Sequence, residues 1–264
     1  MPQPLKLVYY VESDAAALQR RAAQYFADSI QSAVARRGRA RIAVSGGSTP
    51  KPVFAALADP GQEWRGKIPW DRLDIYWVDE RCVPPNDSAS NFRMTREALL
   101  DRVPLEAGQL HRMEGELEPE VAASRYESEL RNSFRLEGAE SPHFDLIQLG
   151  MGADGHTASL FPHTSAVFEF GRLVVANRTQ AEQAWRLTLT AQVINQGPNV
   201  FFLISGGDKA EVLREVFLGT RDPERLPSQL IRPVNGILTL LLDKAAAALL
   251  PAPDGNGRVE LTLR

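Results

Sequence analysis

The stretch FDLIQLGMGADGHTASLFP, residues 144–162, joins an apolar run to a glycine-rich turn and a histidine. Gly150, Gly152 and Gly155 have the spacing G-x-G-x-x-G, which is the spacing of a dinucleotide-binding turn. His156 follows at once, and Pro162 stops any helix soon after. Two interpretations are therefore open: a nucleotide-binding loop, or a turn that presents His156 for chemistry.

The dinucleotide interpretation makes demands that the sequence does not meet. The glycine turn should open a full crossover helix, and the next strand should end in an acidic residue. Pro162 leaves room for roughly two helical turns, and the run RLVVANR ends in Asn177 and Arg178. We therefore favour the second interpretation, because a histidine side chain can take and return a proton near neutral pH.

Short apolar runs alternate with helical patterns along the chain. Runs that are apolar on both faces and separated by helices predict an α/β fold: a mostly parallel, Rossmann-like sheet with helices on both faces. The expected strands are residues 5–11, 40–47, 73–80, 144–150, 172–176, 186–190, 199–207, 236–243 and 258–263. The expected helices are residues 14–37, 48–58, 90–103, 120–134, 208–219 and 244–250. No low-complexity linker divides the chain, so we expect one domain over residues 1–264.

Two strand-to-helix turns share the pattern Ser-Gly-Gly. They are IAVSGGST, residues 42–49, and FLISGGDK, residues 202–209. Either could be a tight turn and nothing more, but glycines allow backbone N–H groups to approach an anion, and strand carboxyl ends are where open α/β sheets bind ligands. Ser48 and Thr49 add hydroxyl donors and Lys209 adds a positive charge, so the two turns together favour an anionic ligand such as a phosphate.

A second polar cluster, Asp79, Glu80 and Arg81, follows the expected strand at residues 73–80. Arg81 is a candidate for stabilising charge that develops on a substrate oxygen. Arg186, at the start of RLTLT, is a further candidate, and Ser90 or Asn91 is expected to cap the next helix.

Other residue types that often carry chemistry give no comparable pattern. Nothing marks Cys82 as a nucleophile. His111, His143 and His163 are interpreted as surface or structural residues, and no paired histidines or cysteine cluster support a metal site, so none is expected.

Bulk properties exclude several classes of protein. The net charge is −3, which offers no electrostatic case for nucleic acid. The single cysteine allows no internal disulfide, and the first residues lack a signal-peptide pattern. The late stretch GILTLLLDKAAAALL carries Asp243 and Lys244 at its centre and is too polar to span a bilayer. We expect a cytoplasmic protein without membrane or nucleic-acid partners, and a monomer.

Four motifs resemble the 6-phosphogluconolactonase family: SGGSTP at residues 45–50, DIYWVDERCVPPNDSASNF at 74–92, LGMGADGHTASLFP at 149–162 and FLISGGDKAEVL at 202–213. The resemblance spans nearly the whole chain. The related glucosamine-6-phosphate isomerases and deaminases typically read DGHIAFNEP where this chain has DGHTASLFP, and DEY where it has DER. Ala153 stands where many lactonases have proline.

The resemblance implies a fold similar to the glucosamine-6-phosphate isomerase/lactonase fold. It also implies hydrolysis of 6-phospho-D-glucono-1,5-lactone in the oxidative pentose phosphate pathway, without an organic cofactor. By motif, His156 would be the general base with Asp154 beside it, and Arg81 would face the substrate. Gly46, Gly47, Ser48 and Thr49 would hold the phosphate, with Lys209 and Arg186 contributing.

Three rival functions remain open at this point. The nearest is an isomerase or deaminase acting on amino-sugar phosphates, which would differ in the residues after His156. A sugar-phosphate-sensing domain of a transcription regulator would need a DNA-binding module, for which we expect no room before the first strand. An NAD(P)-dependent oxidoreductase depends on the glycine spacing alone.

Overall fold

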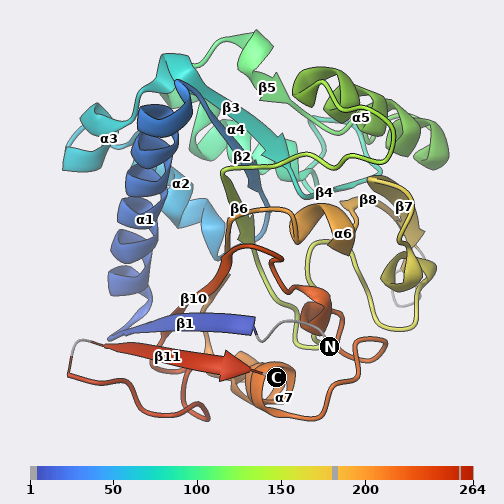
Figure 1. Cartoon of the computed structure of the whole chain (residues 1–264). Coiled ribbons are helices and arrows are strands. Elements are labelled where there is room, and N and C mark those ends of the chain that lie inside the picture. The colour runs from blue at the N-terminus through green and yellow to red at the C-terminus, as the bar shows by residue number, and fades with distance from the viewer. Residues whose placement is uncertain (1–4, 180–183, 256, 264) are drawn as a thin grey trace.

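The computed structural model describes residues 5–179, 184–255 and 257–263. Its main sheet has eight strands in the order β11-β1-β10-β9-β6-β2-β3-β5 (Figure 1). Neighbouring strands are parallel except β1 and β11, so the predicted mostly parallel α/β sheet is confirmed. The strands are β1 Leu5–Glu12, β2 Ala40–Val44, β3 Leu73–Trp77, β5 Leu110–His111, β6 Leu146–Leu149, β9 Asn199–Ile204, β10 Ile237–Asp243 and β11 Arg258–Leu263.

Helices cover both faces of this sheet, as predicted (Figure 1). Side chains along a strand alternate between faces, so Ile42 and Val44 join one apolar core and Ala43 joins the other. The first core includes residues of α1, α2 and α4, and the second includes residues of α5, α6 and α7. The helices are α1 Ala15–Arg37, α2 Pro50–Ala58, α3 Glu63–Lys67, α4 Asn91–Ala98, α5 Pro119–Phe134, α6 Ala191–Ile194 and α7 Ala210–Leu218.

The longest helix, α1, shows why the chain folds as its pattern predicts. The Asp14 side chain accepts a hydrogen bond from the Ala17 N–H at 2.9 Å and so caps its first turn. Gly38 ends it with a φ of 77°, and the Gly38 N–H donates to the Val34 carbonyl. Short 3-10 turns lie at η1 Trp70–Arg72, η2 Leu100–Arg102, η3 Ala107–Gln109, η4 Ser165–Phe168, η5 Gly207–Lys209 and η6 Pro227–Leu230.

A second, antiparallel sheet contains strands that the sequence pattern did not separate from the first. It consists of β4 Asp79–Arg81, β8 Trp185–Leu189 and β7 Val174–Arg178, in that order. Val78 is the point at which the chain changes sheets. Its N–H donates to the Val44 carbonyl at 3.0 Å, and its carbonyl accepts from the Leu189 N–H at 2.8 Å. Asp79, Glu80 and Arg81 therefore form a strand of their own instead of ending β3.

The prediction of a helix after β10 is wrong. Residues 244–249 form turns, because the Asp243 carboxylate accepts from the Ala246 N–H at 2.8 Å and also from the Gly206 N–H and the Ser205 hydroxyl. Asp243 thus ties these turns to the glycine turn after β9.

Two further expectations concern the number of domains and the absence of a membrane-spanning helix. The prediction of one domain over residues 1–264 stays a prediction. In the described part of the chain, no helix has the length and apolar content needed to cross a membrane.

Candidate active site

Three glycine turns lie side by side at one edge of the main sheet. They follow β2, β6 and β9, which are neighbours in the order β9-β6-β2 and run parallel. A cavity of about 240 Å³ opens between these turns. Of the predicted site residues, the following line it: Gly46, Gly47, Ser48, Thr49, Arg81, His156, Arg186 and Lys209. The two segments with the repeated Ser-Gly-Gly pattern therefore form two walls of one cavity.

The third turn carries a histidine–aspartate pair. Nδ1 of His156 lies 2.5 Å from Oδ1 of Asp154, which also accepts from the His156 backbone N–H at 3.2 Å. Burial raises the pKa of Asp154, but the hydrogen bond and charge of His156 lower it by more, so the pKa lies below its usual value. An ionised carboxylate accepts hydrogen bonds and does not donate them, which assigns the proton of neutral His156 to Nδ1. Nε2 is then left with a lone pair.

Two contacts fix the position of the His156 ring. Phe161 stacks on it with ring centroids 4.2 Å apart. On another side, a Cβ atom at residue 152 would lie 2.2 Å from Nδ1 of His156, so only glycine fits there. The imidazole ring thus occupies the space beside Gly152 that a side chain would need.

The G-x-G-x-x-G spacing is explained by this turn and not by a crossover helix. The Gly152 N–H donates to the His156 carbonyl at 2.9 Å, and the Gly155 N–H donates to the Gly152 carbonyl at 3.1 Å. Thr157 and Leu160 then form an isolated antiparallel bridge. A helix, which a dinucleotide site would need, does not follow Gly155.

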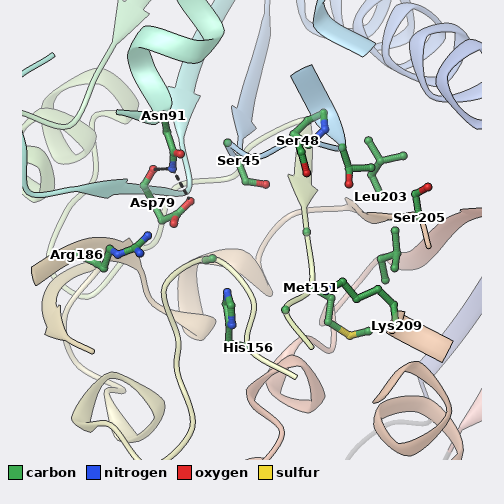
Figure 2. Close-up of a pocket in the computed structure, with 18 of the residues that line it drawn as sticks. Ser45, Ser48, Asp79, Asn91, Met151, His156, Arg186, Leu203, Ser205 and Lys209 are labelled. Carbon is green, nitrogen blue, oxygen red and sulfur yellow. Dashed lines mark hydrogen bonds between the residues drawn. The ribbon is translucent and has the colours of Figure 1, made fainter. Parts of the chain in front are cut away.

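Cationic side chains approach the cavity from two directions. Figure 2 shows Arg186 beside Asp79 on one side, Lys209 near Met151 on the other, and His156 between them. Arg186 is only 9% exposed, and its guanidinium carbon lies 5.8 Å from the centroid of the Phe161 ring. Arg186 is therefore a buried residue of the cavity wall although it lies near the start of its strand. The Lys209 amine lies 3.0 Å from the Asp208 carboxylate.

Asp79 and Asn91 also line the cavity, and the sequence analysis did not single them out as site residues. Asp79 is buried, and its Oδ2 accepts from the Ser159 hydroxyl at 2.8 Å. The Asn91 amide donates to the Asp79 carbonyl at 3.0 Å. A Cβ at Gly46 would lie 1.9 Å from Oδ1 of Asn91, so the first glycine turn packs directly on this amide. The helix cap is Ser90, which accepts from the Arg93 N–H.

Glu80 hydrogen-bonds to the backbone on this side of the cavity. It is buried, and its carboxylate accepts from the backbone N–H groups of Arg81, Asn91 and Phe92 at 2.7–2.8 Å and from the Ser90 hydroxyl at 3.0 Å. Burial raises the pKa of Glu80, and these donors act in the opposite direction. Its polar contacts are all internal, so its role is to hold β4 against the start of α4.

Cys82, His111 and His163, for which we expected no catalytic role, do not line the cavity. Burial, with a contribution from Glu80, raises the pKa of the Cys82 thiol to about 11, which makes it a poor nucleophile near neutral pH. His111 stacks on Tyr76 and contacts Glu129, and His163 is exposed beside Glu224. Within the described ranges, no group of three or more His, Cys, Asp or Glu side chains could hold a metal ion.

The fold and this cavity define an α/β protein with a cavity of glycine turns and cationic side chains at the carboxyl edge of its parallel sheet, which is where open α/β sheets bind ligands. Residues 13–240 match the family model described as glucosamine-6-phosphate isomerases/6-phosphogluconolactonase. The chain belongs to this family.

Curated relatives place the chain on the hydrolase side of the family. It is 41% identical over 223 residues to a 6-phosphogluconolactonase of Synechocystis, covering 84% of this chain and 90% of that one. It is 38% identical over 245 residues to a 6-phosphogluconolactonase of Nostoc, covering 92% and 98%. The structure of 6-phosphogluconolactonase from Trypanosoma cruzi superimposes with a TM-score of 0.80 at 29% identity, covering 96% of this chain and 99% of that one. The chain is accordingly an enzyme of the lactonase type.

Proposed function

We propose that this chain hydrolyses 6-phospho-D-glucono-1,5-lactone to 6-phospho-D-gluconate, the second step of the oxidative pentose phosphate pathway. One observation carries the proposal: His156, whose Nδ1 lies 2.5 Å from the Asp154 carboxylate, lines a cavity whose other walls are two glycine turns and three cationic side chains. A phosphate and a hydrolysable carbonyl each find a suitable partner in such a cavity. The relatives named as 6-phosphogluconolactonases support the same substrate.

In this proposal the phosphate binds first and orients the lactone ring. The backbone N–H groups at Gly46 and Gly47 and the hydroxyls of Ser48 and Thr49 donate to its oxygens, and Lys209 and Arg186 balance its charge. Holding the ring in one orientation turns attack on the carbonyl into an effectively unimolecular step.

The chemical step uses the lone pair on Nε2 of His156. Nε2 takes a proton from water while the water oxygen bonds to the lactone carbonyl carbon, which gives a tetrahedral oxyanion. The protonated imidazole is stabilised by the ionised Asp154. The bond between the carbonyl carbon and the ring oxygen then breaks, the ring oxygen receives the proton from His156, and the ring opens to the acid.

The oxyanion of this intermediate needs hydrogen-bond donors. Arg81 and the backbone N–H groups of the glycine turns are the candidates, because they border the same cavity as His156. Every group required is supplied by the chain, so we expect no cofactor and no metal.

The test is the hydrolysis of freshly generated 6-phosphogluconolactone, compared with its spontaneous loss, in the presence of a chelator. We expect acceleration by the wild-type protein that a chelator does not remove. Release of ammonia from glucosamine 6-phosphate, with no acceleration of lactone loss, would instead identify a deaminase. Binding of 6-phosphogluconate without turnover of either compound would indicate a sugar-phosphate sensor.

A further inference from the structure

A second group of cations borders a small cavity whose lining residues are all different from those of the cavity that contains His156. The cavity is about 60 Å³, which is roughly the space of two water molecules or one small oxyanion. Arg221 and Arg232 line it together with Ser228 and Gln229 of η6, and Phe217 of α7 and Leu263 of β11 provide apolar walls. Figure 1 shows this end of β11 close to α7.

The two arginines of this cavity contact backbone carbonyls and not carboxylates in the part of the chain that the structure describes. Arg221 donates to the Gln229 carbonyl at 2.8 Å, and Arg232 donates to the Leu263 carbonyl at 3.4 Å. Each guanidinium has five N–H donors, so most of them remain available. Within the described ranges neither arginine forms an ion pair; the nearby acids Glu215 and Asp222 are paired with Arg225. Burial and the charge of Arg221 lower the pKa of Arg232.

A buried hydroxyl in the same wall is without a partner. Ser228 is 0% exposed, and its Oγ forms no hydrogen bond with any described residue. A buried hydroxyl that makes no hydrogen bond is destabilising, so an acceptor at this position would stabilise the protein. Two guanidinium groups and a hydroxyl donor around one small cavity are the donors that a tetrahedral oxyanion requires.

We propose that the cavity bounded by Arg221, Arg232 and Ser228 is a binding site for a small oxyanion, with inorganic phosphate as its simplest ligand. The site is distinct from the one assigned to the sugar phosphate, and no residue lines both. The Ser228 backbone N–H donates to the Gly155 carbonyl at 2.9 Å, and Leu226 packs on Gly155. An anion bound at η6 is therefore expected to restrict the position of Gly155, which precedes His156.

The experiment is a titration of the whole protein with inorganic phosphate, followed by amide chemical shifts. Phosphate in the proposed site shifts the amides of Ser228, Gln229 and Arg232, whereas phosphate in the active-site cavity shifts those of Gly46 and Gly47. The two events are thus read separately, and the outcome does not depend on lactonase activity.

Two variants decide the matter. Arg232→Gln is expected to weaken the phosphate response of the η6 amides about tenfold or more, as the loss of a charge-assisted hydrogen bond implies. Arg214→Gln removes an exposed charge from α7 outside this cavity and should leave that response unchanged. The proposal is overturned if the η6 amides of the wild-type protein do not respond to phosphate, or if both variants reduce the response equally.

Discussion

Arg81 and Arg186 lie directly opposite each other on the paired antiparallel strands β4 and β8. Both side chains border the active-site cavity. The antiparallel pairing thus brings two guanidinium groups to one side of the cavity, where the proposed function places a negatively charged ligand.

Neutralising Arg186 should weaken the binding of that ligand. We expect Arg186→Gln to reduce the binding free energy of 6-phosphogluconate by about 1.5–3 kcal/mol, the contribution of a charge-assisted hydrogen bond. The ligand should then raise the melting temperature by less than it does in the wild type. Arg178→Gln, an exposed arginine on the neighbouring strand β7, is the matched control and should keep the full rise. An unchanged rise in the Arg186 variant would remove this residue from the ligand site.

Replacing His156 should separate chemistry from binding. We expect His156→Gln to lower kcat by about 10²–10⁴-fold, the usual contribution of a general base, while the affinity for 6-phosphogluconate is retained. His163→Gln, in which the replaced ring is exposed beside Glu224, should keep kcat. Comparable turnover in the His156 variant and the wild type would show that another group activates the water.

The close approach of Gly152 to His156 gives a third prediction. Gly152→Ala places a methyl group 2.2 Å from Nδ1 of the imidazole, so the ring must move and kcat should fall with the fold intact. In Gly150→Ala the new methyl meets no atom within 4 Å, so the His156 ring should stay in place. The imidazole proton signals in NMR spectra of the two variants report the ring position directly.

The Asp154–His156 pair gives a dependence of stability on pH. Because the pKa of Asp154 is lowered in the folded protein, the pair stabilises it above the ordinary aspartate pKa of about 3.9, and this contribution is lost as the pH falls through the lower folded value. The difference in melting temperature between wild type and Asp154→Asn should therefore be largest near neutral pH and shrink in acid. A difference that is constant down to acid would contradict this linkage.

The main sheet and the edge that holds the site could be predicted because their signals are local. Apolar runs followed by glycine turns identify β2, β6 and β9, and parallel strands place their carboxyl ends at one edge. His156, Lys209 and the Ser-Gly-Gly residues follow from that placement.

The remainder depends on contacts between distant segments. Nothing in RLVVA or RLTLT distinguishes a strand of the small sheet from one of the main sheet, because both patterns describe buried strands. The helix expected after β10 is replaced by turns that the Asp243 side chain stabilises. Asn91 looked like a helix cap because Ser90 and Asn91 are both good caps; its contact with Gly46, 45 residues earlier in the chain, placed it in the cavity.

Val78 connects the two sheets, because its N–H donates to a carbonyl of the main sheet and its carbonyl accepts from an N–H of the small sheet. The histidine and the glycine turns extend from the first sheet, whereas Arg81 and Arg186 extend from the second. Neither sheet alone carries all the side chains of the proposed mechanism, so we expect activity only when the two sheets are docked. During refolding, activity should accordingly return together with the slowest long-range contacts and not with the early formation of helices.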